Sequence, residues 1–383
     1  MSHPADPSRH RAPIGQPDAR IPPSPSQVRR WGRYGHAMHA APCVVCVPAK
    51  LEAKRLPAML AAMAVAFRSL EPMRGALVVA LDGNGDSSEA ILQAARADFP
   101  VDIHIVNLPP HDVPHAGRVR RAAMERGARL FPLEHTILLT TDADTQVDRD
   151  WISATRALMQ TRDFVCGDIW RDDENGRIMR APHEHYYHDL HRVRRSLDPV
   201  AFDADDPHPQ NFGASLAIRR DAYVTIGGCP DVPSNEDVIL TRRARQYGFR
   251  VVQDRSVRVL TSSRRKGRAK GGLAEALVRE DADARAGKPF LIVDPRRYLA
   301  FYRESAELRF GFARNEDARV ERAVERLGLD RLNVEEAWNR ARTADAFVAT
   351  VLDEPDFTAD ITLERARSIL SREIAAPRRM VGA

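Results

Sequence analysis

Acidic side chains in two short segments could bind a metal ion. Asp142 and Asp144 form an Asp-x-Asp pair, and Asp82 opens a glycine-rich stretch that continues to Ser88. Carboxylate oxygens are the ligands that hard divalent cations prefer, and such a cation can carry the charge of a diphosphate. Acidic turns are also common as helix caps, so a purely structural role for the pair stays open.

A second polar segment lies further along the chain. Gly227 and Gly228 precede Ser234-Asn235-Glu236-Asp237. Two adjacent glycines let the backbone approach a ligand closely, and carboxylates at the start of a helix can face a substrate. Ser234 and Asp237 also have the spacing of a capping box, which would explain Asp237 without catalysis. Both roles stay open at this point.

Basic residues are concentrated between residues 255 and 270, with Arg264, Arg265 and Lys266 in direct succession. Arginine forks bind diphosphates through paired hydrogen bonds, glycines within this segment allow a mobile loop, and no aromatic residue is interleaved for base stacking. We therefore expect a lid over a diphosphate, contacted by these three residues. A solvated charged face and a nucleic-acid-binding arm are the alternatives.

Short apolar runs precede the acidic segments and have the pattern of buried strands. They cover 43–47, 76–81, 101–106 and 136–141, and helix-patterned stretches such as 51–70 separate them. This alternation predicts an α/β fold with a Rossmann-like, mostly parallel sheet flanked by helices. Ligands of such sheets bind beyond the carboxyl ends of the strands, so we expect the acidic segments to share one rim.

Composition excludes several classes of protein. The 58 basic residues face 53 acidic ones, and a net charge of +5 is too small an excess to indicate nucleic-acid binding. No window approaches a membrane-spanning length of apolar residues, and the N-terminus lacks the apolar core of a secretory signal. Cys43 and Cys46 lie in the first apolar run, where burial is expected rather than a metal or redox role. We expect a cytoplasmic protein without a transmembrane segment, and contact with a membrane surface stays open.

The combination resembles the family 2 glycosyltransferases with the GT-A fold, across roughly residues 43–272. That family has a Pro-Ala-x-Asn-Glu turn that meets the donor base, and Pro48, Ala49 and Glu52 match it, while Leu51 stands where asparagine is usual. The resemblance implies a nucleotide diphosphate sugar as donor and a hydroxyl group as acceptor. The sequence does not identify the acceptor molecule.

The resemblance also implies roles for residues further along the chain. Asp82 with Gly83 would read the nucleobase, and Arg121 would help to line the donor site. Asp144 would ligate a divalent cation, Mn²⁺ or Mg²⁺, and Asp142 would support the donor's ribose or the metal's ligands. Many members carry a histidine ligand after the strand that precedes the basic loop, whereas this sequence has Val259-Leu260-Thr261-Ser262 there.

On the acceptor side, the resemblance implies that Asp237 is the catalytic base, with Glu236 beside it and Gly227 and Gly228 near the acceptor. We expect Tyr186, in a segment rich in histidine and tyrosine, to form part of the acceptor pocket's wall. A half-exposed amphipathic helix is the alternative there, and the histidines lack the cysteines that would accompany them in many zinc sites.

These inferences combine into a predicted organisation. Residues 1–40, rich in proline, would be a disordered leader. Residues 41–290 would form the GT-A domain, with a nucleotide-binding half at 41–145 and an acceptor half at 146–290, and 291–383 a helical C-terminal extension. The expected activity is the transfer of a single hexose, non-processively and with inversion. A catalytically silent GT-A-like protein that binds nucleotide sugars is the alternative, and the oligomeric state stays open.

Overall fold

The computed structural model describes residues 38–83, 85–109, 115–172, 178–179, 182–200, 202–267, 273–353, 355 and 357–375. The predicted disordered leader therefore lies almost entirely outside the described residues. Among those described, no helix combines the length and the hydrophobicity needed to cross a membrane.

Among the described residues, a nine-stranded mixed sheet forms the centre of the protein. Its first half has the order β3-β2-β1-β4, and all neighbours in it are parallel. These strands are β1 (Cys43–Ala49), β2 (Gly75–Asp82), β3 (Asp102–Leu108) and β4 (Ile137–Thr140). The predicted strands and the predicted fold class are confirmed, and the carboxyl ends of these strands lie at one edge of the sheet.

The second half of the sheet continues in the order β8-β6-β9-β5, with β7 paired to β6. Only β6 and β9 are parallel here, and the other pairs are antiparallel. The strands are β5 (Thr145–Val147), β6 (Phe164–Asp172), β7 (Ile178–Met179), β8 (Leu216–Arg219) and β9 (Val251–Ser262). The pairing of β5 with β9 brings the Asp-x-Asp turn, which precedes β5, close to the carboxyl end of β9.

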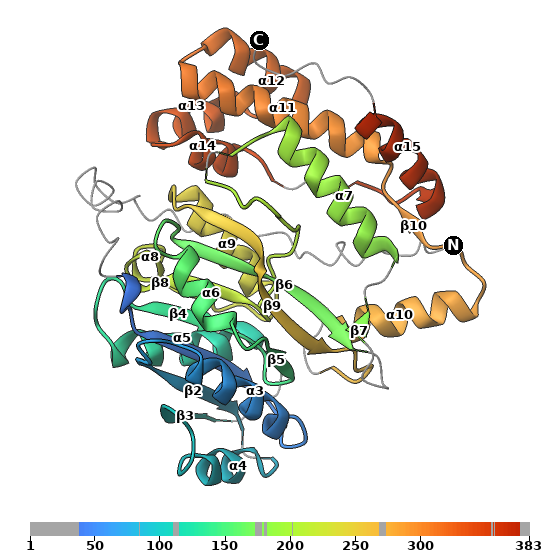
Figure 1. The fold of residues 1–383 in the computed structure, drawn as a ribbon. Helices are drawn as coiled ribbons and strands as arrows, with labels where there is room; N and C mark the ends of the chain where they lie inside the picture. The colour runs from blue at the N-terminus through green and yellow to red at the C-terminus, as the bar shows by residue number, and fades with distance from the viewer. Residues whose placement is uncertain are drawn as a thin grey trace.

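Helices cover both faces of the sheet (Figure 1). On β1, Val45 and Val47 belong to one hydrophobic core together with α3, and Val44 and Cys46 belong to the opposite core together with α5. A strand that is buried on both faces reads as a continuous apolar run, which is why this strand was predictable. The helices around the sheet are α3 (Leu56–Arg68), α4 (Ser88–Ala95), α5 (Ala116–Leu130), α6 (Trp151–Leu158), α8 (Arg220–Thr225), α9 (Glu236–Gln246) and α10 (Leu273–Arg285).

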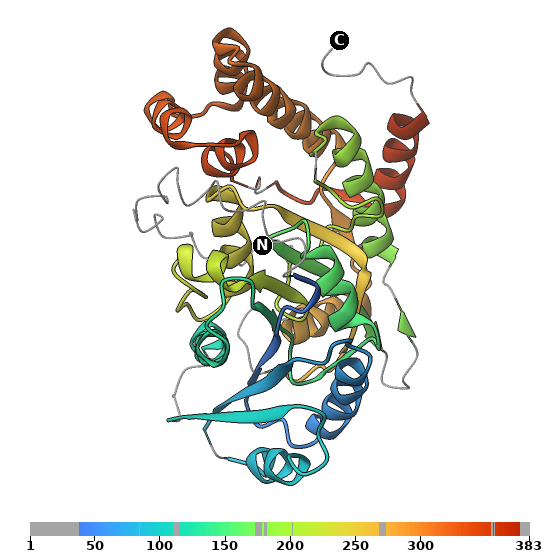
Figure 2. The ribbon, with the colours of Figure 1, turned by 60° about the vertical axis from the view of Figure 1, so that its left-hand side comes forward.

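A layer of C-terminal helices lies beside this sheet, on the side of α9 (Figure 1 and Figure 2). Helix α7 (Pro182–Leu197), from the middle of the chain, packs against α11 and α15, and α14 packs against α9. The helices are α11 (Pro295–Arg314), α12 (Asp317–Leu327), α13 (Arg331–Arg340), α14 (Ala344–Val351) and α15 (Leu363–Ala375). The predicted helical extension is confirmed, with the addition of a two-stranded sheet of β10 (Leu291–Ile292) and β11 (Ile361–Thr362).

Candidate active site

A cleft of about 480 Å³ opens at the carboxyl ends of β1, β2 and β4. Residues from the start of α5, the start of α9 and the end of β9 complete its walls. The predicted residues that line it are Pro48, Ala49, Glu52, Asp82, Asp142, Asp144, Glu236, Asp237 and Arg264. Residues as distant in sequence as Pro48 and Arg264 therefore share one cavity.

The turn after β1 contains Leu51, where the motif has asparagine. Leu51 has φ 52°, in the left-handed region that asparagine tolerates better than other non-glycine residues. The backbone N–H of Glu52 donates to Ser88 Oγ at 3.2 Å, and that of Ala53 donates to Asp86 Oδ2 at 2.9 Å. These bonds tie the turn to the start of α4, so the glycine-rich loop and the first turn form one wall.

Asp82 lies at the bottom of this wall, with a side chain that is only 2% exposed. Lys50 Nζ donates to Asp82 Oδ2 at 2.8 Å. Asp82 Oδ1 is buried and accepts no hydrogen bond from any described residue, and the Arg118 guanidinium is 4.0 Å from it. A buried carboxylate oxygen that lacks a donor fits a ligand that supplies an N–H or O–H group.

Asp144 forms an ion pair with Arg264 of the basic segment. Arg264 Nε is 3.2 Å from Asp144 Oδ2, and Arg264 Nη1 donates to Glu52 Oε1 at 2.8 Å and to Glu52 Oε2 at 2.9 Å. Burial raises the pKa of Asp144 to about 6, and Arg264 opposes that rise while Asp142 and Glu52 add to it. A carboxyl in this position gains from a cation, because a nearby positive charge favours its ionised form.

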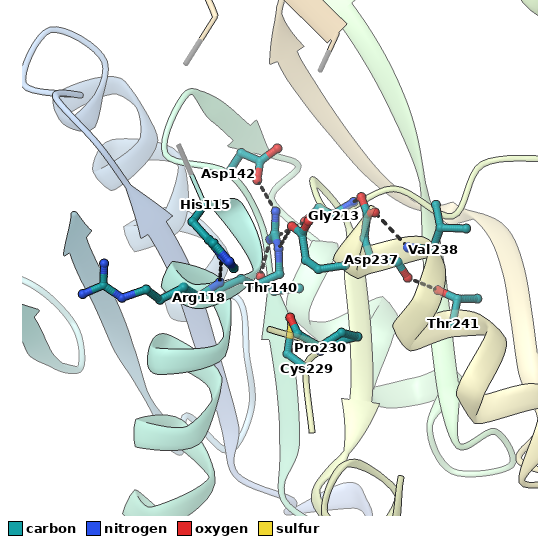
Figure 3. A network of polar contacts seen from close by, with 12 residues as sticks. His115, Arg118, Thr140, Asp142, Gly213, Cys229, Pro230, Asp237, Val238 and Thr241 are labelled. Carbon is teal, nitrogen blue, oxygen red and sulfur yellow. Dashed lines mark hydrogen bonds and ion pairs between the residues drawn. The ribbon is translucent and has the colours of Figure 1, made fainter. Parts of the chain in front are cut away.

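Arg120 connects Asp142, in the turn after β4, to Glu236 at the start of α9. Its Nε donates to Glu236 Oε1 at 2.9 Å and its Nη2 donates to Asp142 Oδ1 at 2.9 Å. Its Nη1 donates to Thr140 Oγ1 at 2.7 Å and to the carbonyl oxygen of Gly213 at 3.0 Å (Figure 3). Burial alone would lower the pKa of Arg120, but the surrounding carboxylates raise it, so the guanidinium stays charged.

Asp237 faces the cleft from the first turn of α9. Its Oδ2 accepts from the backbone N–H of Gly213 at 2.6 Å, and its Oδ1 accepts from the N–H of Val238 at 2.8 Å (Figure 3). Burial, followed by the charge of Glu236, raises the pKa of Asp237 to about 6, while Arg120 and the two N–H donors lower it. A carboxylate with this pKa is ionised at pH 7 yet basic enough to accept a proton.

The capping-box alternative for Ser234 and Asp237 does not hold. The N-cap of α9 is Asn235, with φ 61° and no side-chain hydrogen bond to the helix, so Ser234 lies one residue before the capping position. One oxygen of the Asp237 carboxylate accepts from Gly213 N–H in a distant loop, and the other accepts from Val238 N–H within α9. These two bonds together fix its orientation.

The structure places Arg121 outside the cleft, where its side chain donates to Glu125 Oε1 and to the Cys229 carbonyl oxygen. The preceding residue, Arg120, lines the cleft instead. The sequence carried a signal for this choice, because Arg120 lies on the buried face of α5 with Val119, Ala123 and other apolar residues. A charged residue on an apolar helix face needs a partner, which points to a site.

Among the described basic residues of the segment 255–270, Arg264 alone lines the cleft. Arg265 pairs with Asp281 on α10, and Lys266 is exposed and is not among the lining residues. Residues 268–272 lie outside the described residues, so the predicted lid is not tested.

Tyr186 requires a correction. It is 1% exposed and belongs to a hydrophobic cluster with Leu299 and Ala366 of the C-terminal helices, and burial raises its pKa. It therefore cannot offer a stacking surface to an acceptor. Phe212, which sequence reasoning missed, is 52% exposed and lines the cleft beside Gly213.

Gly227 and Gly228 lie outside the cleft as well and shape the loop that follows them. Both have left-handed backbone conformations, with φ 82° and 78°, and a side chain at Gly228 would approach the ring of Tyr223. This loop accepts a hydrogen bond at the Val232 carbonyl oxygen from Gly117 N–H, at 3.1 Å. The loop after the glycine pair thus bonds to the start of α5, and the glycines themselves do not line the cleft.

The two cysteines of β1 do not line this cleft. Cys43 and Cys46 are fully buried in β1, and burial raises the pKa of the Cys43 thiol to about 12, so a reactive thiolate is disfavoured. Across the described residues, no group of three or more histidine, cysteine, aspartate or glutamate side chains is arranged to hold a metal ion by itself.

Comparison with known proteins gives a family-level match. Residues 44–227, slightly less than half of the chain, match the family model described as Glycosyl transferase family 2. The match covers the strands and turns that carry Pro48, Asp82 and Asp144, and it ends at Gly227, before α9.

Several solved structures of low sequence identity are similar to this chain. PcManGT, a mannosyltransferase from Pyrobaculum calidifontis in complex with GDP-Man and Mn²⁺, is 16% identical, with coverage of 81% of this chain and 85% of that chain and a TM-score of 0.46. S. aureus TarS 1–349 in complex with UDP-GlcNAc is 14% identical, with 87% of each chain covered and a TM-score of 0.44. A longer TarS structure, with 16% identity and a TM-score of 0.42, is matched over 58% of this chain and 36% of its own length. No curated protein matches the sequence.

Proposed function

We propose that this chain is a family 2 glycosyltransferase that moves a single sugar from a nucleotide diphosphate sugar to an acceptor hydroxyl, with inversion and with the help of Mn²⁺ or Mg²⁺. The observation that carries the proposal is the convergence of Asp82, Asp144 and Asp237 on one cleft. PcManGT binds GDP-Man and Mn²⁺, and TarS binds UDP-GlcNAc. The donor class proposed for this chain agrees with these ligands.

The donor would lie along the rim of the parallel strands. The free oxygen of Asp82 accepts a hydrogen bond from the nucleobase, and the turn from Pro48 to Glu52 holds the base and ribose. Arg264 then faces the diphosphate, since it already lies between Glu52 and Asp144 at the end of β9. Its planar guanidinium can donate two hydrogen bonds to phosphate oxygens.

The residues present fit a divalent cation that takes part of its ligands from the donor. Asp144 and Asp142 offer carboxylate oxygens in the cleft, and Mg²⁺ commonly binds through one or two carboxylates plus substrate phosphates. When bound, such an ion supplies charge stabilisation to the departing diphosphate. Arg120 holds Asp142 in place, and Arg264 adds a second positive charge.

Asp237 would act as the general base. The N–H groups of Gly213 and Val238 fix its carboxylate, and its raised pKa suits the removal of a proton from an acceptor hydroxyl. The hydroxyl oxygen then forms a bond to the anomeric carbon while the bond from that carbon to the diphosphate oxygen breaks. Attack from the face opposite the nucleotide inverts the anomeric configuration.

A panel of nucleotide diphosphates, each with and without Mn²⁺, tests donor binding by thermal shift. Specific binding at about 100 times Kd adds about 2.7 kcal/mol to the free energy of unfolding, and the preferred base identifies the donor class. If no nucleotide diphosphate raises the melting temperature under any condition, the donor proposal fails.

The variant Asp237→Asn tests the base. We expect turnover to fall by about 10²- to 10⁴-fold with nucleotide binding unchanged. The surface variant Asp283→Asn, which removes an exposed pair with Lys288, is the matched control and should keep full activity. Near-normal transfer by Asp237→Asn would contradict the assignment, and nucleotide binding without turnover in the unaltered protein would favour the silent binding protein.

A further inference from the structure

Strand β6 separates the cleft from a second pocket. Ile169 and Arg171 line the cleft, whereas the alternate residues Asp168 and Trp170 line a pocket of about 350 Å³. Successive side chains of a strand point to opposite faces, so the two cavities lie on opposite sides of β6. The volume falls within the range of about 300–1,000 Å³ that is usual for ligand pockets. The other lining residues are His185, His188, Asp206, Arg255 and Arg258.

An irregularity in β9 forms one wall of this pocket. Gly167 on β6 pairs with Asp254, but the next residue, Asp168, pairs with Arg258, so residues 255–257 have no partner on β6. The carboxylate of Asp254 accepts from Ser256 N–H at 2.8 Å and supports the bulged backbone. Bulges redirect side chains, and here Arg255 and Arg258 both face the pocket.

Trp170 provides a flat apolar wall in a fixed orientation. Its Nε1–H donates to Asp168 Oδ2 at 2.9 Å, and Asp168 is only 2% exposed. The guanidinium carbon of Arg258 lies 6.0 Å from the centre of the indole ring. Because the indole N–H already has a partner, the ring contributes its face rather than a hydrogen bond to anything that binds here.

The charges of the pocket are balanced by neighbours. Arg255 Nη2 is 2.6 Å from His188 Nδ1, and Arg255 Nη1 is 3.6 Å from Asp206 Oδ1. Arg258 donates to Asp148 Oδ2 at 2.7 Å. A phosphate or sulfate would have to compete with these carboxylates for both arginines. A neutral ring with several hydroxyl groups, by contrast, can use an aromatic face together with both donors and acceptors at the rim.

We propose that this pocket is a saccharide-binding site, separate from the catalytic cleft, that takes neutral hexose units of a glycan. Trp170 stacks on one face of a sugar ring, and Arg255 and Asp206 bond its hydroxyl groups from the opposite rim. The inference goes beyond the transfer reaction, because none of these residues lines the cleft in which donor and base are placed.

Ligand-observed NMR and calorimetry on the full chain test the site with maltotetraose and cellotetraose as neutral probes and a sulfated heparin tetrasaccharide as the anionic one. We expect a neutral tetrasaccharide to bind and Trp170→Ala to weaken it by at least about tenfold. Arg322→Ala, an exposed arginine on α12, is the control and should leave binding unchanged. Absence of binding by both neutral probes, or selective binding of the sulfated probe, overturns the proposal.

Two further variants keep the test decisive if Trp170→Ala does not fold. Asp206 has a side chain that is 66% exposed and Arg255 one that is 33% exposed, so Asp206→Ala and Arg255→Ala should fold normally. Each is expected to weaken the neutral tetrasaccharide measurably while leaving the thermal shift by nucleotide diphosphates unchanged. Unchanged tetrasaccharide binding in both variants overturns the proposal. Loss of tetrasaccharide binding in Asp237→Asn also overturns it, because that result would place the saccharide in the cleft. A protein that binds the tetrasaccharide but no nucleotide would contradict the proposed transfer reaction and not the saccharide site.

Discussion

Arg264 donates to both carboxylate oxygens of Glu52, at 2.8 and 2.9 Å, although 212 residues separate them in the sequence. The same guanidinium also lies 3.2 Å from Asp144. The contact therefore joins the turn after the first strand, the Asp-x-Asp turn and the basic segment at a single side chain. It also distinguishes Arg264 from the neighbouring arginine, which pairs with a surface carboxylate.

This distinction gives a matched pair of variants. We expect Arg264→Ala to weaken nucleotide diphosphate binding by about 10- to 100-fold, the effect of losing charge-assisted hydrogen bonds. Arg265→Ala removes an exposed pair with Asp281 and should change the affinity little. Calorimetric titration of both variants with the preferred nucleotide measures the difference. Equal losses in the two variants would show that the segment acts through its net charge rather than through Arg264.

A second matched pair lies on α5. Arg120→Ala leaves Glu236, whose side chain is 4% exposed, and Asp142 without their shared cation, and breaking a buried ion pair costs about 3–5 kcal/mol. Arg121→Ala removes a half-exposed pair with Glu125 and should cost less than about 1 kcal/mol. Urea unfolding monitored by circular dichroism gives both free energies. A loss in Arg120→Ala no larger than that in Arg121→Ala would contradict the central role of Arg120.

The raised pKa of Asp237 predicts how activity depends on pH. A general base works in its ionised form, so turnover at saturating donor should be constant above pH 7 and fall as the pH decreases through about 6. Unfolding caused by protonation of Asp237 would not explain this fall in turnover. The pKa of Asp237 is higher in the folded protein than in the unfolded chain, so its protonation stabilises the folded state. Rate profiles from pH 5 to 9, with circular dichroism at each end, provide the measurement. Full turnover at pH 5 would contradict the assignment.

Leu51 offers a test of the departure from the family motif. Its φ of 52° is strained for a leucine, and its side chain is 42% exposed, so little burial is lost on replacement. Leu51→Asn should therefore raise the free energy of unfolding by about 1 kcal/mol, since asparagine tolerates this conformation better. Leu51→Ala keeps the strain and should not stabilise the protein. A melting temperature that is unchanged or lower in Leu51→Asn would show that the leucine side chain itself is needed.

Local patterns were enough to predict the first half of the sheet and the segments that follow its strands. β1, β2 and β4 are buried between helices, and such strands appear in a sequence as continuous apolar runs. In a parallel sheet their carboxyl ends meet at one edge, so the placement of Asp82 and Asp144 in one cleft followed from the order of the elements.

Contacts between distant segments decided the rest. Whether Arg120 or Arg121 enters the cleft depends on how α5 is rotated against the sheet, and whether Tyr186 faces a ligand depends on C-terminal helices that pack over it. Asp237 satisfied a capping pattern in the sequence, yet its carboxylate turned to Gly213, 24 residues away. The spacing of apolar residues indicates whether a segment is a helix or a strand. Which face of that element is buried, and which partner buries it, is decided only when the elements pack together.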